Sequence, residues 1–154
     1  MLTLFLLVAS FSVNTQATTL DCRKPDEYRL VVVQNPNRRK EWDSGDPDDV
    51  NILVGDDVVA RIELPKEGEV KNFSVNDIKK TKSGFVIETD WGASMYHYEV
   101  QFDFRCRRKR FYLYRVTHVS LLTKHPEKGF WDTTVTKITK PNLPIEKFVM
   151  TRYL

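Results

Sequence analysis

The sequence contains few of the residues that build metal and cofactor sites. Only 2 cysteines and 3 histidines occur among its 154 residues, and no two histidines have the HExxH or H-x3-H spacing of a zinc site. The Gly-rich loops that bind nucleotide phosphates and the GxSxG turn that carries a catalytic serine are both absent. We therefore expect no zinc site, no cofactor and no nucleotide-dependent chemistry.

Long apolar runs are also missing, since no segment approaches the ~20 residues that a membrane-spanning helix needs. The most apolar segment, residues 1–17, has no charged side chain, and it ends in Thr15-Gln16-Ala17, with small residues where a signal peptidase cleaves. We interpret residues 1–17 as a signal peptide and residues 18–154 as a single β-rich domain, periplasmic or secreted, with no stable membrane insertion.

The cysteine content agrees with an oxidising compartment. Cys22 and Cys106 are the only two cysteines, and an even number in an exported protein favours one disulfide. We predict that this bridge joins the start of the mature chain to a central hairpin, with a structural role.

Alternation with a period of two dominates the sequence, and no window shows a sustained helical stripe. Between residues 96 and 106, aromatic and apolar side chains alternate without error with polar ones, which is typical of a strand with one buried face. The other predicted strands are 28–33, 51–54, 58–64, 73–78, 85–91, 111–119, 131–138 and 147–153, and residues 74–80 would also fit a short helical turn. The pattern predicts an all-β antiparallel sandwich or partly open barrel of seven to nine short strands.

Acidic residues gather in one segment, because residues 41–57 contain seven acids and no base. Such a segment fits a solvated turn, a calcium loop that lacks EF-hand spacing, or a protein-binding loop with an aromatic anchor. Of the two functional interpretations, we rank protein binding above calcium. Its candidate partner-binding residues are Trp42, Asp43, Asp46, Asp48 and Asp49.

Basic residues gather between positions 105 and 110, where five surround a single cysteine. A solvated hairpin tip explains them, and an exported protein rarely meets nucleic acid, so we expect no nucleic-acid partner. An acidic partner protein or an anionic wall polymer would suit the same surface. Arg107, Arg108 and Arg110 are the candidate contact residues.

Two other functions remain open at this point. A row of outward side chains at His97, Glu99 and Asp103 could support acid–base chemistry in a wall-active hydrolase, although half-exposed strands often carry such rows. A lipocalin-like barrel could carry a small apolar ligand against Tyr96, Tyr98, Phe102 and Phe104. We expect a protein without enzymatic activity.

Several segments of the chain together resemble a known class of protein. These segments are 84–87, 91–92, 98–106, 111–114 and 140–148. They look like the small exported β-rich immunity proteins of Gram-negative bacteria, which neutralise toxins of type VI and similar secretion systems. The lysozyme-inhibitor families are a related resemblance, through Ser83-Gly84.

The resemblance implies a function in bacterial competition. It implies a periplasmic inhibitor that occludes the active site of a cognate effector toxin or cell-wall hydrolase. It carries no catalytic residues over to this chain, because such proteins share no catalytic signature.

Overall fold

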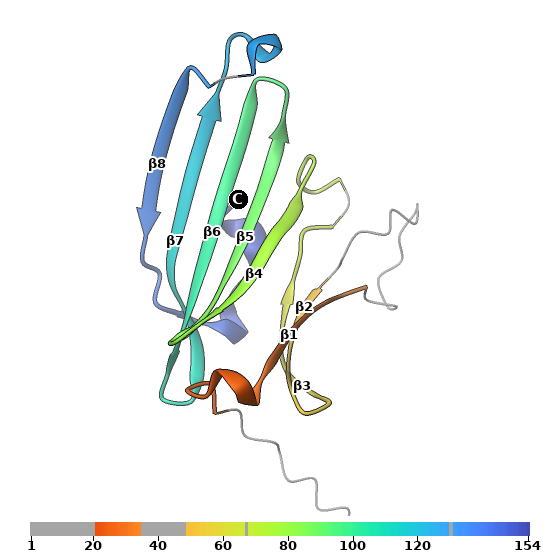
Figure 1. Ribbon diagram of the computed structural model, residues 1–154, viewed down its shortest axis with the longest axis vertical. Coiled ribbons are helices and arrows are strands. Elements are labelled where there is room, and N and C mark those ends of the chain that lie inside the picture. Colours follow the sequence, from red (N-terminus) through yellow and green to blue (C-terminus); the bar gives the residue numbers. More distant parts are fainter. Residues whose placement is uncertain (1–20, 35–48, 67, 130) are drawn as a thin grey trace, which may run out of the picture.

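The computed structural model describes residues 21–34, 49–66, 68–129 and 131–154 (Figure 1). The described strands form two separate antiparallel sheets. The small sheet has the order β1-β2-β3, and the large sheet has the order β4-β5-β6-β7-β8, with β9 also pairing with β7. The predicted β-sandwich is therefore confirmed, and the described sheets do not close into a barrel.

The strand boundaries follow the alternating segments of the sequence. The small sheet consists of β1 (Arg29–Val33), β2 (Asp49–Val54) and β3 (Asp57–Glu63). The large sheet consists of β4 (Ser74–Thr81), β5 (Gly84–Ala93), β6 (Tyr96–Arg107), β7 (Arg110–Leu122), β8 (Thr133–Thr139) and β9 (Leu143–Pro144). Helical structure in the described residues is limited to four 3-10 turns, η1 (Pro25–Glu27), η2 (Pro126–Lys128), η3 (Ile145–Lys147) and η4 (Met150–Arg152).

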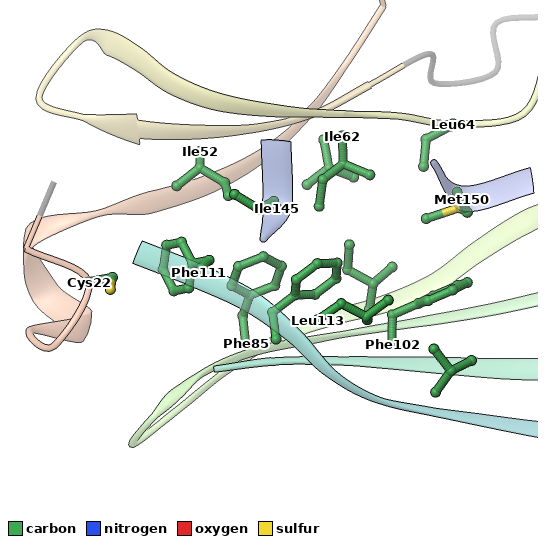
Figure 2. Close-up of a cluster of buried hydrophobic side chains, with 14 of the residues drawn as sticks. Cys22, Ile52, Ile62, Leu64, Phe85, Phe102, Phe111, Leu113, Ile145 and Met150 are labelled. Atoms are coloured by element: carbon green, nitrogen blue, oxygen red, sulfur yellow. The ribbon is translucent and has the colours of Figure 1, made fainter. Parts of the chain in front are cut away.

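The core lies between the small sheet and one half of the large sheet (Figure 2). Phe85, Phe102 and Phe104 from the large sheet have no solvent exposure, and Phe85 stacks on Phe104 with ring centroids 4.7 Å apart. Ile52 and Ile62 of the small sheet complete the same cluster. Burial of these side chains is the main favourable term that holds the two sheets together.

The C-terminal segment differs from the prediction, because residues 147–153 do not form a strand. They form η3, η4 and the residues around them, and they lie over the inner face of the large sheet. Phe148 and Tyr153 pack against Phe102, with centroid distances of 5.4 and 6.5 Å. Pro144 removes a backbone donor just before this segment, so the chain leaves the ladder and buries its rings from single turns.

The alternative of a helical turn at residues 74–80 is also wrong, because this segment is strand β4. Val75 pairs with Thr89 and Ile78 with Ile87, with a β-bulge between Val75 and Asp77. The bulge places two apolar residues three positions apart on the same face, which imitates helical spacing in the sequence. Among the described residues no helix is long and apolar enough to cross a bilayer.

Gly84 is needed where β5 begins, because its backbone lies very close to that of the paired strand β6. A Cβ at this position would overlap the carbonyl oxygen of Phe104 and come within 2.9 Å of the Cα of Arg105. The Tyr28 hydroxyl also donates a hydrogen bond to the Gly84 carbonyl, at 2.8 Å. Any side chain here must therefore push the two strands apart.

We expect Gly84→Ala to lower the free energy of unfolding by about 1–3 kcal/mol, the usual cost of overpacking. Urea denaturation followed by tryptophan fluorescence measures the change. The neighbouring exposed Ser83→Ala should stay within about 0.5 kcal/mol of the wild type. Equal midpoints for the two variants would show that the strands absorb the extra methyl group.

Candidate interaction surface

The β6–β7 hairpin ends in a two-residue turn made of basic side chains. Arg107 pairs with Arg110, so Arg108 and Lys109 are the two central residues. Both have positive φ, 51° and 63°, as a type I′ turn requires. Asn-Gly is the favoured pair in this turn, because a longer L-residue with positive φ costs roughly 1–2 kcal/mol.

The tip presents its charges to solvent. Arg107, Arg108, Lys109 and Arg110 are all exposed, and none of them forms an ion pair within the described ranges. The predicted hairpin, with a solvent-exposed basic tip at these positions, is therefore confirmed. Four neighbouring cations without an ion pair in the described structure concentrate positive charge at this end of the hairpin.

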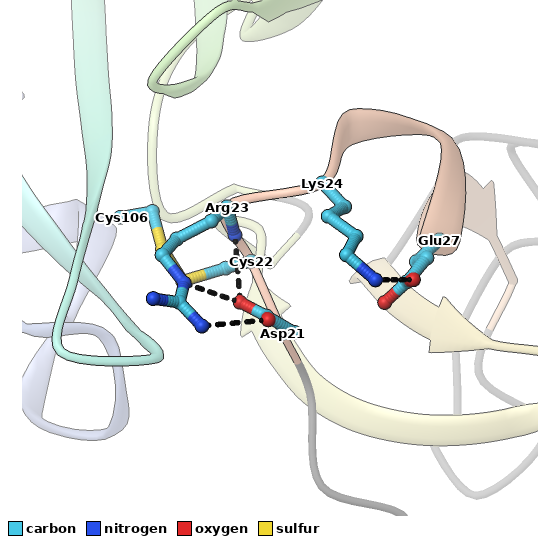
Figure 3. A network of polar contacts seen from close by, with 6 residues as sticks. All are labelled: Asp21, Cys22, Arg23, Lys24, Glu27 and Cys106. Atoms are coloured by element: carbon cyan, nitrogen blue, oxygen red, sulfur yellow. Dashed lines mark hydrogen bonds and ion pairs between the residues drawn. A yellow bond between two sulfur atoms is a disulfide. The ribbon is translucent and has the colours of Figure 1, made fainter.

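A disulfide fixes the hairpin close to its tip. Cys22 and Cys106 are bonded, as predicted, with their Cα atoms 5.5 Å apart (Figure 3). The amide of Cys106 also donates a hydrogen bond of 2.6 Å to the carbonyl of Ser83. The tip therefore projects from a segment that is held covalently and by the β4–β5 turn.

The residues around the disulfide form a local ionic network (Figure 3). Arg23 donates hydrogen bonds to both carboxylate oxygens of Asp21, at 2.8 and 2.9 Å. These bonds lower the pKa of Asp21 to about 2, with a smaller contribution from the charge of Lys109. Asp21 thus stays ionised above this pKa and holds Arg23 beside the bridge.

At the root of the hairpin, Asp103 is a buried structural carboxylate. It is 6% exposed and lies 3.5 Å from the guanidinium of Arg105 and 3.4 Å from that of Arg115. Arg105 also lies over the ring of Tyr114, 3.6 Å from its centroid. Asp103 therefore serves to position two arginines.

The acidic candidates have a different outcome. Trp42, Asp43, Asp46 and Asp48 lie outside the described residues. Asp49 begins β2 and is 1% exposed, and its carboxylate lies 3.5 Å from the guanidinium of Arg61. Its assignment to an exposed binding loop is corrected, because burial and this ion pair make it part of the small sheet.

The row of His97, Glu99 and Asp103 does not form a carboxylate pair. His97 lies 3.6 Å from Asp90 and 4.0 Å from Glu99, and its ring stacks on Trp131. Glu99 and Asp103 are four residues apart on one strand, about 13 Å at 3.3 Å per residue. That separation exceeds the 5–9.5 Å of glycosidase carboxylates, so the geometry gives the hydrolase alternative no support. No metal-binding cluster occurs in the described part of the chain either.

The four aromatic residues proposed to line a carrier cavity lie on one face of β6 but in two environments. Phe102 and Phe104 are buried in the filled core, whereas Tyr96 is 53% exposed. Tyr98 lies between them and stacks on Trp91, with ring centroids 4.0 Å apart. The four residues therefore do not enclose a common cavity, which leaves the carrier alternative without a site.

No protein-family model, curated protein or solved structure matches this chain.

Proposed function

We propose that this protein is an exported, non-catalytic inhibitor that neutralises a toxin or a cell-wall hydrolase. In this proposal the basic tip at Arg107–Arg110 enters an acidic active site and occludes it. The observation that carries the proposal is the set of four exposed cations on a two-residue turn, none with an ionic partner in the described residues. The predicted signal peptide and the disulfide support export to the periplasm or the medium.

Rigidity supports an inhibitory rather than an adaptable role. The tip is one residue from a disulfide and continues two long paired strands, so little freedom remains to be lost on binding. Free cations also steer an acidic partner toward the tip and raise the association rate. Occlusion of an active site requires only these properties and no chemistry by the inhibitor.

The strained turn supports a functional reason for the charges. Arg108 and Lys109 occupy positions that Asn and Gly would fill at lower conformational cost. Backbone strain of this kind often marks binding sites, where function opposes stability. We infer that the two basic side chains are kept for their contacts.

The variant Arg108→Asn with Lys109→Gly tests this inference. We expect the free energy of unfolding to rise by roughly 1–2 kcal/mol, because both residues tolerate positive φ. We also expect association with the captured partner to slow by at least about tenfold at low salt, because two steering charges are lost. Chemical denaturation and surface plasmon resonance provide the two measurements.

The partner is captured first, by immobilising the oxidised wild-type chain and passing periplasmic and secreted proteins over it. A supporting result is a retained hydrolase or toxin whose activity falls when the wild-type chain is added and recovers with the tip variant. Lys79→Gln, which removes a β4 cation paired to Asp77 and to Glu88 of β5, is the control for loss of a surface charge that is already neutralised. The proposal fails if the tip variant inhibits as well as the wild type.

A further inference from the structure

A hollow opens beside the hairpin because the strand next to β7 is interrupted. β8 ends at Thr139, opposite Val116, and β9 begins at Leu143, opposite Leu113. Between these pairs, β7 carries a bulge that leaves Tyr114 without a counterpart on β6. The hollow between the interrupted edges has a volume of about 470 Å³, within the range of small-molecule sites.

The side chains around this hollow are cationic and aromatic. Its lining consists of Arg105, Cys106, Arg107, Tyr112, Tyr114, Lys140 and Asn142. No acidic residue contributes to it, so the lining carries three positive charges. Two phenol groups and one carboxamide add neutral hydrogen-bond donors.

The charges at the hollow are only partly neutralised. Asp103 contacts Arg105 from outside the lining, but it shares its single charge with Arg115. Arg107 and Lys140 have no ion pair with any described residue. The Nε of Arg105 is shielded from solvent and has no hydrogen-bond acceptor in the described structure. The Arg105 side chain as a whole is 43% exposed, so a ligand in the hollow would meet the outer part of its guanidinium and not the shielded Nε.

We propose that the hollow binds the phosphate monoester of a small phosphorylated sugar. A phosphate dianion matches several cations that converge from β6 and from the β8–β9 connection, and arginine binds its oxygens with two N–H groups. Tyr112 supplies the apolar surface against which the sugar would lie, because Arg105 already covers one face of the Tyr114 ring. This site shares Arg107 with the tip, but Arg108 and Lys109 do not line the hollow, so the two proposals can be tested apart.

Isothermal titration calorimetry with glucose 6-phosphate tests the proposal on the oxidised full chain. We expect glucose 6-phosphate to bind about tenfold more tightly than inorganic phosphate and glucose to show no binding. Binding to vesicles that contain phosphatidic acid is measured in parallel, because the headgroup of this lipid carries the same phosphate monoester. Preference for the vesicles over glucose 6-phosphate would overturn the assignment to a small sugar.

Variants then locate the site. Lys140→Gln should weaken glucose 6-phosphate binding at least tenfold, since hydrogen bonds to charged groups contribute about 1.5–3 kcal/mol. Lys128→Gln, at an exposed residue of η2 that does not line the hollow, should leave binding unchanged. If both variants lost the same affinity for glucose 6-phosphate, binding would depend only on the net charge of the protein, and the proposal would be overturned.

The tip variant separates this proposal from the inhibitory one. Arg108→Asn with Lys109→Gly leaves every lining residue in place, so it should still bind glucose 6-phosphate like the wild type. Absence of binding to the wild type would reject the phosphate site and leave the tip proposal standing. If the tip variant bound glucose 6-phosphate normally and still inhibited the captured partner, only the proposal that the tip inhibits would be rejected.

Discussion

Loss of the Cys22–Cys106 disulfide should lower the free energy of unfolding by about 4.5 kcal/mol. The bridge spans 84 residues of sequence, and the entropy that a cross-link removes from the unfolded chain grows with loop length. Since small domains are stable by only about 5–15 kcal/mol, this loss approaches the whole stability.

Guanidinium denaturation of the wild type and of Cys22→Ser with Cys106→Ser measures the change. The wild type in excess dithiothreitol should unfold at the same midpoint as the double variant, which separates loss of the bridge from the effect of the new hydroxyl groups. Coincident midpoints for oxidised and reduced protein would contradict the prediction. In that case the contacts around the bridge, and not the bridge itself, hold the N-terminal segment.

The sequence predicts the fold well wherever a strand has one buried face. In β6, Val100, Phe102 and Phe104 are buried while Glu99 on the other face is exposed, as the alternation requires. Asp103 departs from this pattern because it lies against Arg105 and Arg115. The cysteines were equally informative, because only one pairing was available. Local pattern suffices in these cases because each residue's environment follows from its parity along the strand.

Prediction failed where tertiary packing overrides the local pattern. Residues 147–153 are apolar enough for a strand, but Phe148 and Tyr153 fill space left by the two sheets, which no local pattern reveals. The bulge in β4 likewise depends on its pairing with β5. Both errors concern positions whose partners are distant in sequence.

The same distinction applies to the candidate sites. The basic tip was predictable because its charges are contiguous between two alternating segments. The hollow was not, because Lys140 and Asn142 reach Arg105 only through the interrupted pairing of β7. The acidic neighbours of Asp49 predict a surface position for it, yet it is buried in the small sheet, where Arg61 pairs with it.

Among the described residues, the inner face of the large sheet divides into a half that other segments cover and a half that none covers. Phe102 is fully buried beneath Phe148 and Tyr153, whereas Tyr96, on the same strand and the same face, is 53% exposed. Stability should therefore be concentrated at the covered half, where the small sheet and the C-terminal turns meet the large sheet. The open half contributes less and tolerates substitution.

Truncation of an aromatic side chain at each end of β6 tests this division. Phe102→Ala should lower the free energy of unfolding by about 3–5 kcal/mol, because it leaves a cavity among packed rings. Tyr96→Ala removes a ring of similar size from the same face and should cost less than about 1 kcal/mol, since most of that ring is already hydrated. Urea denaturation of both variants, monitored by near-ultraviolet circular dichroism, gives the comparison. Equal losses would mean that the open half is covered in solution, by a second copy of the chain or by residues outside the described ranges.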